Sequence, residues 1–237
     1  MDVNKAVRFV FEDKQWISKL LIGVLMSLLA FFIIPGLILN GYVIKLVRQV
    51  MNGNRDTLPE WEDYGKLLRD GFFVTVGELV WMLPLILLVI IVTLATSGVG
   101  SLSDDAAAVA ATGGGLLLLC LVLLVVVAAL FLTPALLIQY AIKDDFGALF
   151  RFGEVFDIIR NHMSDILIAF LVTLAAVFVV SLIGGVLGII PCLGWIAAFV
   201  IGLAAGPYVS FLGGHLYGQI AAKVLGNKVG NYYPPMA

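Results

Sequence analysis

One acidic side chain is a candidate for chemistry, because it lies inside an otherwise apolar stretch. Glu78 occurs in the segment FFVTVGELVWMLP, and a carboxylate at membrane depth is costly unless it has a partner. Counted inward from the charged ends of their segments, Glu78, Asn40 and His215 lie about 9, 8 and 12 Å deep, at a helical rise of about 1.5 Å per residue. Asn and His side chains can both donate a hydrogen bond to a carboxylate. The sequence therefore predicts a polar cluster of these three residues, suited to passing a small solute or an ion; the alternative is a structural clamp around Glu78.

Other patterns that catalysis or cofactor binding would need are not found in the sequence. The glycine-rich stretch GVGSLSDD lacks the Lys-Ser/Thr of a nucleotide-binding loop, and no Ser-His-Asp arrangement follows from spacing. Two histidines and two cysteines are too few for a metal site. Cys120 and Cys192 are interpreted as small apolar fillers, with a disulfide as the alternative. We therefore expect a protein that is not an enzyme and that binds no cofactor or metal.

The composition places the chain in a membrane. Hydrophobic residues make up 62% of the 237 residues and charged residues 13%, whereas a soluble domain carries about 25% charged residues. Apolar runs of about 20 residues are typical of helices that cross a bilayer. The net charge of −2 does not favour nucleic acid as a partner. The expected partner is the lipid bilayer, and the expected fold is an all-α, polytopic membrane helix bundle that forms a single domain over residues 1–237.

Five long apolar stretches define the expected membrane segments. They span residues 17–44, 72–97, 115–142, 166–190 and 195–222. Pro35-Gly36 interrupts the first stretch, and a proline cannot continue a helix without a kink. The first stretch is therefore either a hairpin of two short helices or one long kinked span. The domain accordingly has three parts: the hairpin with an interfacial helix and an inner loop helix (1–71), the second and third long segments (72–142), and an interfacial helix with a C-terminal helical hairpin (143–237).

The positions of Lys and Arg favour the hairpin. With a hairpin, all 14 basic residues fall on one side of the membrane, and this side is expected to be cytoplasmic, because Lys and Arg are enriched in cytoplasmic loops. The sequence thus predicts about six segments in the cell membrane, with both termini cytoplasmic. The second half of the hairpin is about 16 Å long, which is short for a hydrocarbon core of about 30 Å. It is therefore expected to be tilted, re-entrant or shielded by protein.

Three amphipathic segments are expected to form short interfacial helices on the cytoplasmic side. They cover the N-terminus, residues 57–71 and residues 144–161, where apolar residues share one helical face. Thr57 and Glu60 form a capping-box pattern at the start of the second segment. We interpret this face as a cytoplasmic rim that docks a partner, and its candidate residues are Trp61, Glu62, Asp63, Arg69 and Arg160. The alternative is ordinary anchoring of the interface by aromatic side chains.

Small residues recur at every fourth position in the last apolar stretch. The series contains Gly202, Gly206, Ser210, Gly214 and Gly218. Helices in lipid associate through close backbone contact, which small residues permit. A four-residue step drifts by about 40° against a 3.6-residue turn, so the ladder winds around its helix. It therefore predicts a central helix that packs against several neighbours; the alternative is a broken helix that lines a solute path, because Pro207 lies within the ladder.

Three pieces of the N-terminal half carry a resemblance to a known family. They are FVFEDKQWISKLLIG, GYVIKLVRQVMNG and LPEWEDYGKLLRDG, of which Leu58-Pro59-Glu60-Trp61 is the most specific. Together they resemble the uncharacterised prokaryotic membrane family known as domain of unknown function 4013. The resemblance implies an archaeal or bacterial protein with several membrane spans. It implies no activity and no catalytic residues.

Three functions agree with these observations. The first is a non-enzymatic membrane scaffold or accessory subunit, which would bind a membrane-protein partner or a second copy of the chain through the rim and the glycine ladder. The second is a transporter of a small solute or an ion that uses Glu78 and His215. The third is a lipid-facing enzyme, which is disfavoured because the loops are too short to hold a catalytic domain.

The charge pattern makes the orientation testable. In a background without Cys120 and Cys192, we expect a cysteine at position 2 to be labelled from the cytoplasmic side and a cysteine at position 105 from the outer side, because basic residues are retained inside. Labelling by a membrane-impermeant thiol reagent, in intact and in permeabilised cells, measures this. Equal labelling of both positions in intact cells would contradict the predicted orientation.

Overall fold

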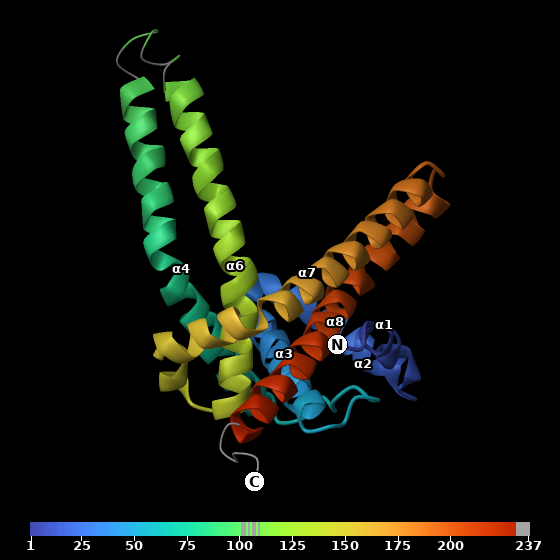
Figure 1. Ribbon diagram of the computed structural model, residues 1–237. Helices are drawn as coiled ribbons and strands as arrows, with labels where there is room; N and C mark the ends of the chain where they lie inside the picture. The colour runs from blue at the N-terminus through green and yellow to red at the C-terminus, as the bar shows by residue number, and fades with distance from the viewer. Residues whose placement is uncertain (101–102, 104, 106–107, 109, 231–237) are drawn as a thin grey trace.

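The computed structural model describes residues 1–100, 103, 105, 108 and 110–230, so the glycine-rich stretch at 98–105 lies partly outside the described residues. The described chain is built from helices joined by short connections (Figure 1). In order they are α1 (Val3–Glu12), α2 (Trp16–Leu28), η1 (Leu29–Phe32), α3 (Ile34–Met51), α4 (Tyr64–Gly100), η2 (Ala110–Gly114), α6 (Gly115–Lys143), η3 (Phe146–Phe150), α7 (Phe152–Gly188) and α8 (Leu193–Gly230). The expected all-α fold is confirmed for these residues.

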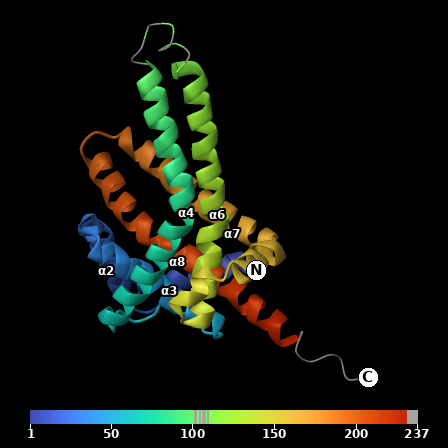
Figure 2. The ribbon, with the colours of Figure 1, turned by 90° about the vertical axis from the view of Figure 1, so that its left-hand side faces the viewer.

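Two long helical hairpins, α4–α6 and α7–α8, rise from a common end of the molecule and diverge (Figures 1 and 2). We call this common end the base. It contains α1, α3, residues 52–63, the first turns of α4, the last turns of α6, η3 and the C-terminal half of α8. Most of the fully buried apolar side chains lie in the base, whereas the distal halves of the hairpins are largely exposed. The hydrophobic core is therefore concentrated at one end of the molecule.

Four of the described helices are long and apolar enough to cross a membrane. They span Tyr64–Gly98, Thr112–Lys143, Phe152–Gly188 and Leu193–Gly226. A fifth is counted if Val3–Glu12 and Trp16–Phe32, which are bent by 99° at their junction, act as one broken span. The chain is thus a multi-pass membrane protein with four to five such helices. The second half of the predicted first hairpin corresponds to α3. This helix is not among the four or five, and it contributes buried residues to the base.

The first apolar stretch is interrupted close to the predicted position. α2 continues into η1, and the helical path then breaks at Ile33, whose backbone has φ 65° and ψ −57°. Pro35 lies in the first turn of α3, where its missing N–H breaks no helical hydrogen bond. The stretch is therefore divided into two helices at this point.

The helix α8 is central, but only part of its glycine ladder is packed. α8 packs against α7, α3, α2, α6 and α1. A Cβ on Gly218 would lie 2.6 Å from Val50 Cβ, and one on Gly214 would lie 3.1 Å from Val43 Cγ1. The absence of a side chain at both glycines therefore lets α3 pack closely against α8. A Cβ on Gly202 or Gly206 would meet no neighbouring atom within 4 Å. The expected packing therefore does not extend along the whole ladder within this chain.

The closest helix crossing lies elsewhere, between α3 and α4. A Cβ on Gly41 would collide with the Leu67 carbonyl oxygen, and a Cβ on Gly71 would collide with that of Leu37. The two glycines thus let the two backbones touch, which larger residues would prevent. This contact sets how the start of α4 leans on α3.

The two halves of the ladder should respond differently to added bulk. Gly218→Leu must displace α3, so we expect it to lower the free energy of unfolding by about 1–3 kcal/mol, the usual cost of overpacking. Gly206→Leu is its matched control and should change stability little, because its surroundings are open. Thermal melts of the detergent-purified proteins measure both. Equal melting temperatures for the two variants would contradict the packing described here.

Candidate functional site

Glu78 lies on α4 and faces α6. Thr133 on α6 lies beside its carboxylate. The residue also borders a groove of about 320 Å³ along α4, which is lined by Thr75, Val76, Glu78, Leu79, Met82 and Ile86. The groove is apolar apart from Thr75 and Glu78. Among the described residues, Asn40 bonds to Thr75, and His215 bonds to Arg55 and Gln219, so neither of these bonds involves the carboxylate.

The predicted cluster of Glu78, Asn40 and His215 is not assembled as one hydrogen-bonded unit. Asn40 is exposed and donates from Nδ2 to Thr75 Oγ1 at 3.2 Å. His215 on α8 is fully buried, and the centroid of its ring lies 4.4 Å from that of the Phe9 ring. Equal depth in the membrane does not bring side chains together, because the direction in which each points depends on its helical face. His215 is therefore bonded elsewhere, whereas Asn40 bonds to Thr75, which lines the same groove as Glu78.

His215 belongs instead to a clamp in the base. The amide of Gln219 accepts from the Asp2 N–H at 2.6 Å and donates to the Asp2 carbonyl at 2.9 Å and to His215 Nδ1 at 3.1 Å. With Nδ1 accepting, Nε2–H donates to the Arg55 carbonyl at 3.1 Å. The clamp joins the N-terminus, residues 52–63 and α8. Its donors and acceptors are matched when His215 is neutral, so its geometry is that of a structural contact.

Residues 52–63 form a segment that we call the strap, which runs from α3 to α4 without becoming helical. The Leu58 N–H donates to Asp13 Oδ2 at 2.9 Å. The carbonyls of Leu58, Pro59 and Glu60 each accept from a side chain at 2.8 Å, and the donors are Lys19, Tyr42 and Lys45. The interfacial helix expected from residue 57 does not form there, because these backbone groups are bonded to side chains of other elements. The helix begins only at Tyr64.

A buried ion pair holds the strap in place. Asp13 and Lys19 are 4% and 5% exposed, and Lys19 Nζ lies 2.9 Å from Asp13 Oδ2. Burial alone would raise the pKa of Asp13, but hydrogen bonds from Lys19 and from the N–H groups of Gln15 and Leu58 hold it below its ordinary value. Lys19 also contacts Glu60 Oε1 at 2.7 Å. The carboxylate of Asp13 is therefore ionised in the folded protein at neutral pH.

The aromatic part of the predicted rim is used inside the molecule. Trp61 stacks on Tyr42 with ring centroids 3.8 Å apart and an interplanar angle of 12°. Its Nε1–H donates to the Lys19 carbonyl at 3.0 Å. Tyr42 is itself fully buried. Trp61 thus secures the strap on α2 and α3, and its docking role stays a prediction.

The charged residues of the predicted rim differ in their ion pairs and in their exposure. Glu62 pairs with Lys45 at 3.0 Å, and Arg69 pairs with Asp70 at 2.9 Å and with Asp144 at 3.3 Å. Asp63 and Arg160 are exposed. The base therefore presents charges to its surroundings, but Glu62 and Arg69 already have partners within the chain.

A second buried carboxylate, which the sequence did not single out, joins three helices. Asp70 on α4 is 1% exposed and accepts from Tyr140 Oη on α6 at 2.9 Å. Arg48 on α3 also donates to Asp70, and its guanidinium lies 5.3 Å from the centroid of the Tyr140 ring. In the sequence Asp70 and Arg48 look like ordinary charges beside apolar stretches. Only their meeting across α3, α4 and α6 shows that they are part of the packing.

Metal binding has no support in the geometry of the described residues. Within the ranges that the structure describes, His, Cys, Asp and Glu side chains form no group of three that could hold a metal ion. The polar side chains described above are instead engaged with one another. The candidate site of this chain is therefore a set of interhelical contacts at the base and one half-buried carboxylate, Glu78, beside an apolar groove.

These features define a multi-pass membrane protein whose described helices are joined at a base that holds the hydrophobic core and buried polar contacts. Residues 24–193 match the model of a family described as Protein of unknown function (DUF4013), and the chain belongs to that family. Neither a curated protein nor a solved structure matches it. The matched range includes Gly41, Tyr42 and the strap but begins after Asp13. The three sequence pieces that carried the resemblance meet in the base, where Asp13, Tyr42 and Leu58–Trp61 are in contact.

The Asp13–Lys19 pair should make the fold sensitive to acid. Because the folded pKa of Asp13 is lowered, the pair stabilises the protein above the carboxyl pKa of the unfolded chain, and this stabilisation is lost as the pH falls below about 4. Asp13→Asn leaves Lys19 buried without its main partner, so we expect a loss of about 3 kcal/mol at neutral pH. Thermal melts at a series of pH values measure this difference.

The matched control is the neighbouring exposed carboxylate. Glu12→Gln removes the ion pair between Glu12 and Lys5. Because the Glu12 side chain is 43% exposed, this change should lower the free energy of unfolding by at most about 1 kcal/mol. The difference between wild type and Asp13→Asn should narrow as the pH falls below about 4. A difference that is constant with pH, or equal losses for both variants at neutral pH, would contradict the assigned role.

Proposed function

We propose that the protein is a non-enzymatic membrane scaffold or accessory subunit, which binds another membrane protein, or a second copy of the chain, along its diverging hairpins. One observation carries this proposal. In the most apolar windows of the four long helices only between 0% and 22% of the residues are buried within the chain. The hairpins therefore offer long apolar faces that the chain itself does not cover.

A scaffold needs its binding faces to be held in fixed positions, and the contacts in the base hold the helices that carry these faces. The strap, the Asp13–Lys19 pair and the Asp70 network bond α2, α3, α4 and α6 to one another through buried polar groups. Beyond the base, each hairpin is held mainly by its own two helices. The His215 clamp ties α8 to the strap in the same region, so the base sets the angle between the hairpins, and a partner would find both faces already in position.

Small residues on the second hairpin favour a helical partner. Beyond the base, Gly202 and Gly206 on α8 and Gly184 and Gly188 on α7 have open space where a Cβ would lie. A partner helix could approach these backbones closely, which is the main source of helix association in lipid. Following the positive-inside rule, we place the base, the strap and both termini on the cytoplasmic side of the cell membrane.

Transport of a small solute or an ion is a second candidate function. It is favoured by the half-buried carboxylate of Glu78, because intramembrane carboxylates are often functional. It draws no support from His215, which is bonded within the clamp of the base. Glu78→Gln would abolish solute uptake by a transporter but should leave partner binding by a scaffold unchanged.

The scaffold proposal can be tested with variants that add bulk to an exposed face without disturbing the fold. We expect wild type, cross-linked in its own membrane and purified in mild detergent, to yield a defined complex larger than the monomer. Gly202→Leu and Gly206→Leu should lose this complex while keeping the wild-type melting temperature, because both positions are open in the chain. Size-exclusion chromatography with mass spectrometry of the cross-linked species measures it.

Val126→Leu is the control, because Val126 is 55% exposed on the other hairpin. It should keep the complex. A monomer in all cross-linked samples, or a complex that both glycine variants retain in full, would overturn the proposal.

A further inference from the structure

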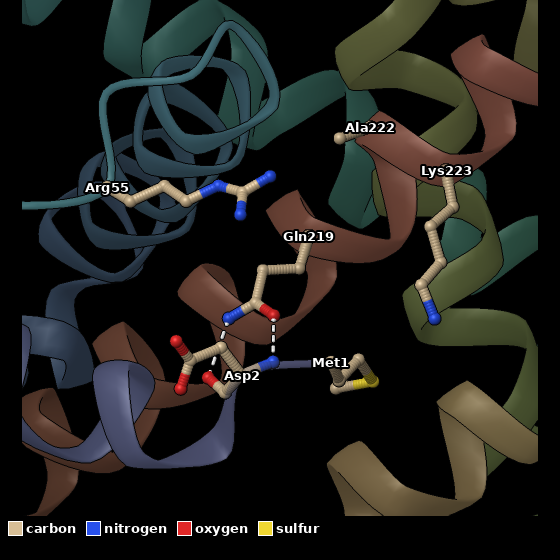
Figure 3. Close-up of a pocket in the computed structure, with 6 residues that line it drawn as sticks. All are labelled: Met1, Asp2, Arg55, Gln219, Ala222 and Lys223. Atoms are coloured by element: carbon tan, nitrogen blue, oxygen red, sulfur yellow. Dashed lines mark hydrogen bonds between the residues drawn. The ribbon is translucent and has the colours of Figure 1, made fainter.

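A polar cavity opens in the base between three segments that are distant in the sequence. Its volume is about 300 Å³, and its lining consists of Met1, Asp2, Arg55, Gln219, Ala222 and Lys223 (Figure 3). The lining comes from the N-terminus, the strap and α8. The cavity lies beside the His215 clamp and away from the groove at Glu78, so it is a separate place in the fold.

The floor of the cavity is rigid. Gln219 is 4% exposed, and its amide is committed to the backbone of Asp2 and to His215. Figure 3 shows the two bonds between Gln219 and Asp2, with Gln219 between the side chains of Arg55 and Lys223. Because Gln219 and the backbone of Asp2 are held in this way, the floor exists before any ligand binds.

The charges around the cavity are not balanced. Among the described residues no carboxylate forms an ion pair with the Arg55 guanidinium. Lys223 has one partner, Asp165, at 2.7 Å. The Asp2 carboxylate caps α1, where it accepts from the Lys5 N–H at 2.9 Å. The lining side chains therefore include two cations, Arg55 and Lys223, and a single carboxylate, Asp2, that is already engaged.

We propose that this cavity binds a phosphate-bearing anion, held between Arg55 and Lys223. A guanidinium presents two parallel N–H donors to phosphate oxygens, and a lysine ammonium adds a point charge. The volume accommodates a phosphate group and its ester substituent, and the two side chains flank the cavity from opposite sides (Figure 3). Asp165 shares Lys223 with the anion, so it competes with the ligand.

Two sources can supply this chemistry: the headgroup of an anionic lipid, or a soluble phosphate. The cavity lies in the polar base at the end of the apolar helix α8, which is the level at which lipid headgroups meet such a helix. The proposal does not depend on the scaffold function.

The test uses the full chain, delipidated in a neutral detergent. It is titrated with short-chain phosphatidic acid, with the matching phosphatidylcholine and with inorganic phosphate, and thermophoresis reports binding. We expect saturable binding of phosphatidic acid, weakened about tenfold by Arg55→Gln and by Lys223→Gln. Phosphatidylcholine should bind more weakly than phosphatidic acid. If inorganic phosphate binds with the same dependence on both residues, the ligand is a soluble phosphate; if only phosphatidic acid does so, it is a lipid.

Two controls separate the site from general charge and from folding. Lys66→Gln removes an exposed cation outside the cavity and should leave binding unchanged. Asp165→Asn breaks the same ion pair as Lys223→Gln but keeps the cation, so it should tighten binding. Equal weakening by Arg55→Gln, Lys223→Gln and Lys66→Gln, weakening by Asp165→Asn, or no saturable binding of any phosphate would overturn the proposal.

Discussion

The arrangement of the base depends on one buried ion pair between Asp13 and Lys19. Removing two charges from water costs several kcal/mol for each ion, and here the cost is offset by several charged hydrogen bonds. Asp13 accepts from Lys19, Gln15 and Leu58, and Lys19 also reaches the Leu58 carbonyl. The same two side chains thus fix the bend between α1 and α2 and the path of the strap. Trp61 of the strap closes the contact by stacking on Tyr42 of α3.

This concentration of polar contacts at one end explains the shape of the molecule. Inside a bilayer there is little hydrophobic force to hold one helix against another, so helices stay together only where packing or polar bonds join them. The base provides such bonds through the strap and through Asp70, which joins α3, α4 and α6. Toward the tips the apolar faces are not joined by such bonds, and there the hairpins α4–α6 and α7–α8 diverge (Figure 1).

The functional proposals follow from these two regions separately. The diverging hairpins present apolar faces and open glycines, which favour a helical partner. The base presents charge and one preformed cavity, which favours an anionic ligand. The His215 clamp lies next to this cavity and holds the N-terminus against α8. In the scaffold proposal, these features would hold partners in position by the shape of the protein.

The sequence by itself determined the class of protein, the helical fold, the approximate limits of the four long helices and the break near Pro35. These properties depend on local composition and on the presence of proline, which each segment carries independently of its neighbours. The family was also accessible from the sequence, because its pattern lies in short contiguous pieces. The partners of the polar residues could not be predicted in this way. Counting residues gives the depth of Glu78 or His215 in the membrane, but the direction of each side chain depends on how whole helices are rotated and packed.

Only the tertiary structure decided which small and charged residues act together. Gly214 and Gly218 pack on α3 whereas Gly202 and Gly206 are open, although all four share one spacing in the sequence. Residues 57–60 carry a helix-capping pattern, yet they are not helical, because side chains of distant segments bind the backbone groups of residues 58–60. These side chains are Asp13, Lys19, Tyr42 and Lys45. In each case the contacting groups come from segments that are far away in the chain. A local sequence pattern therefore cannot predict the free energy of their contacts.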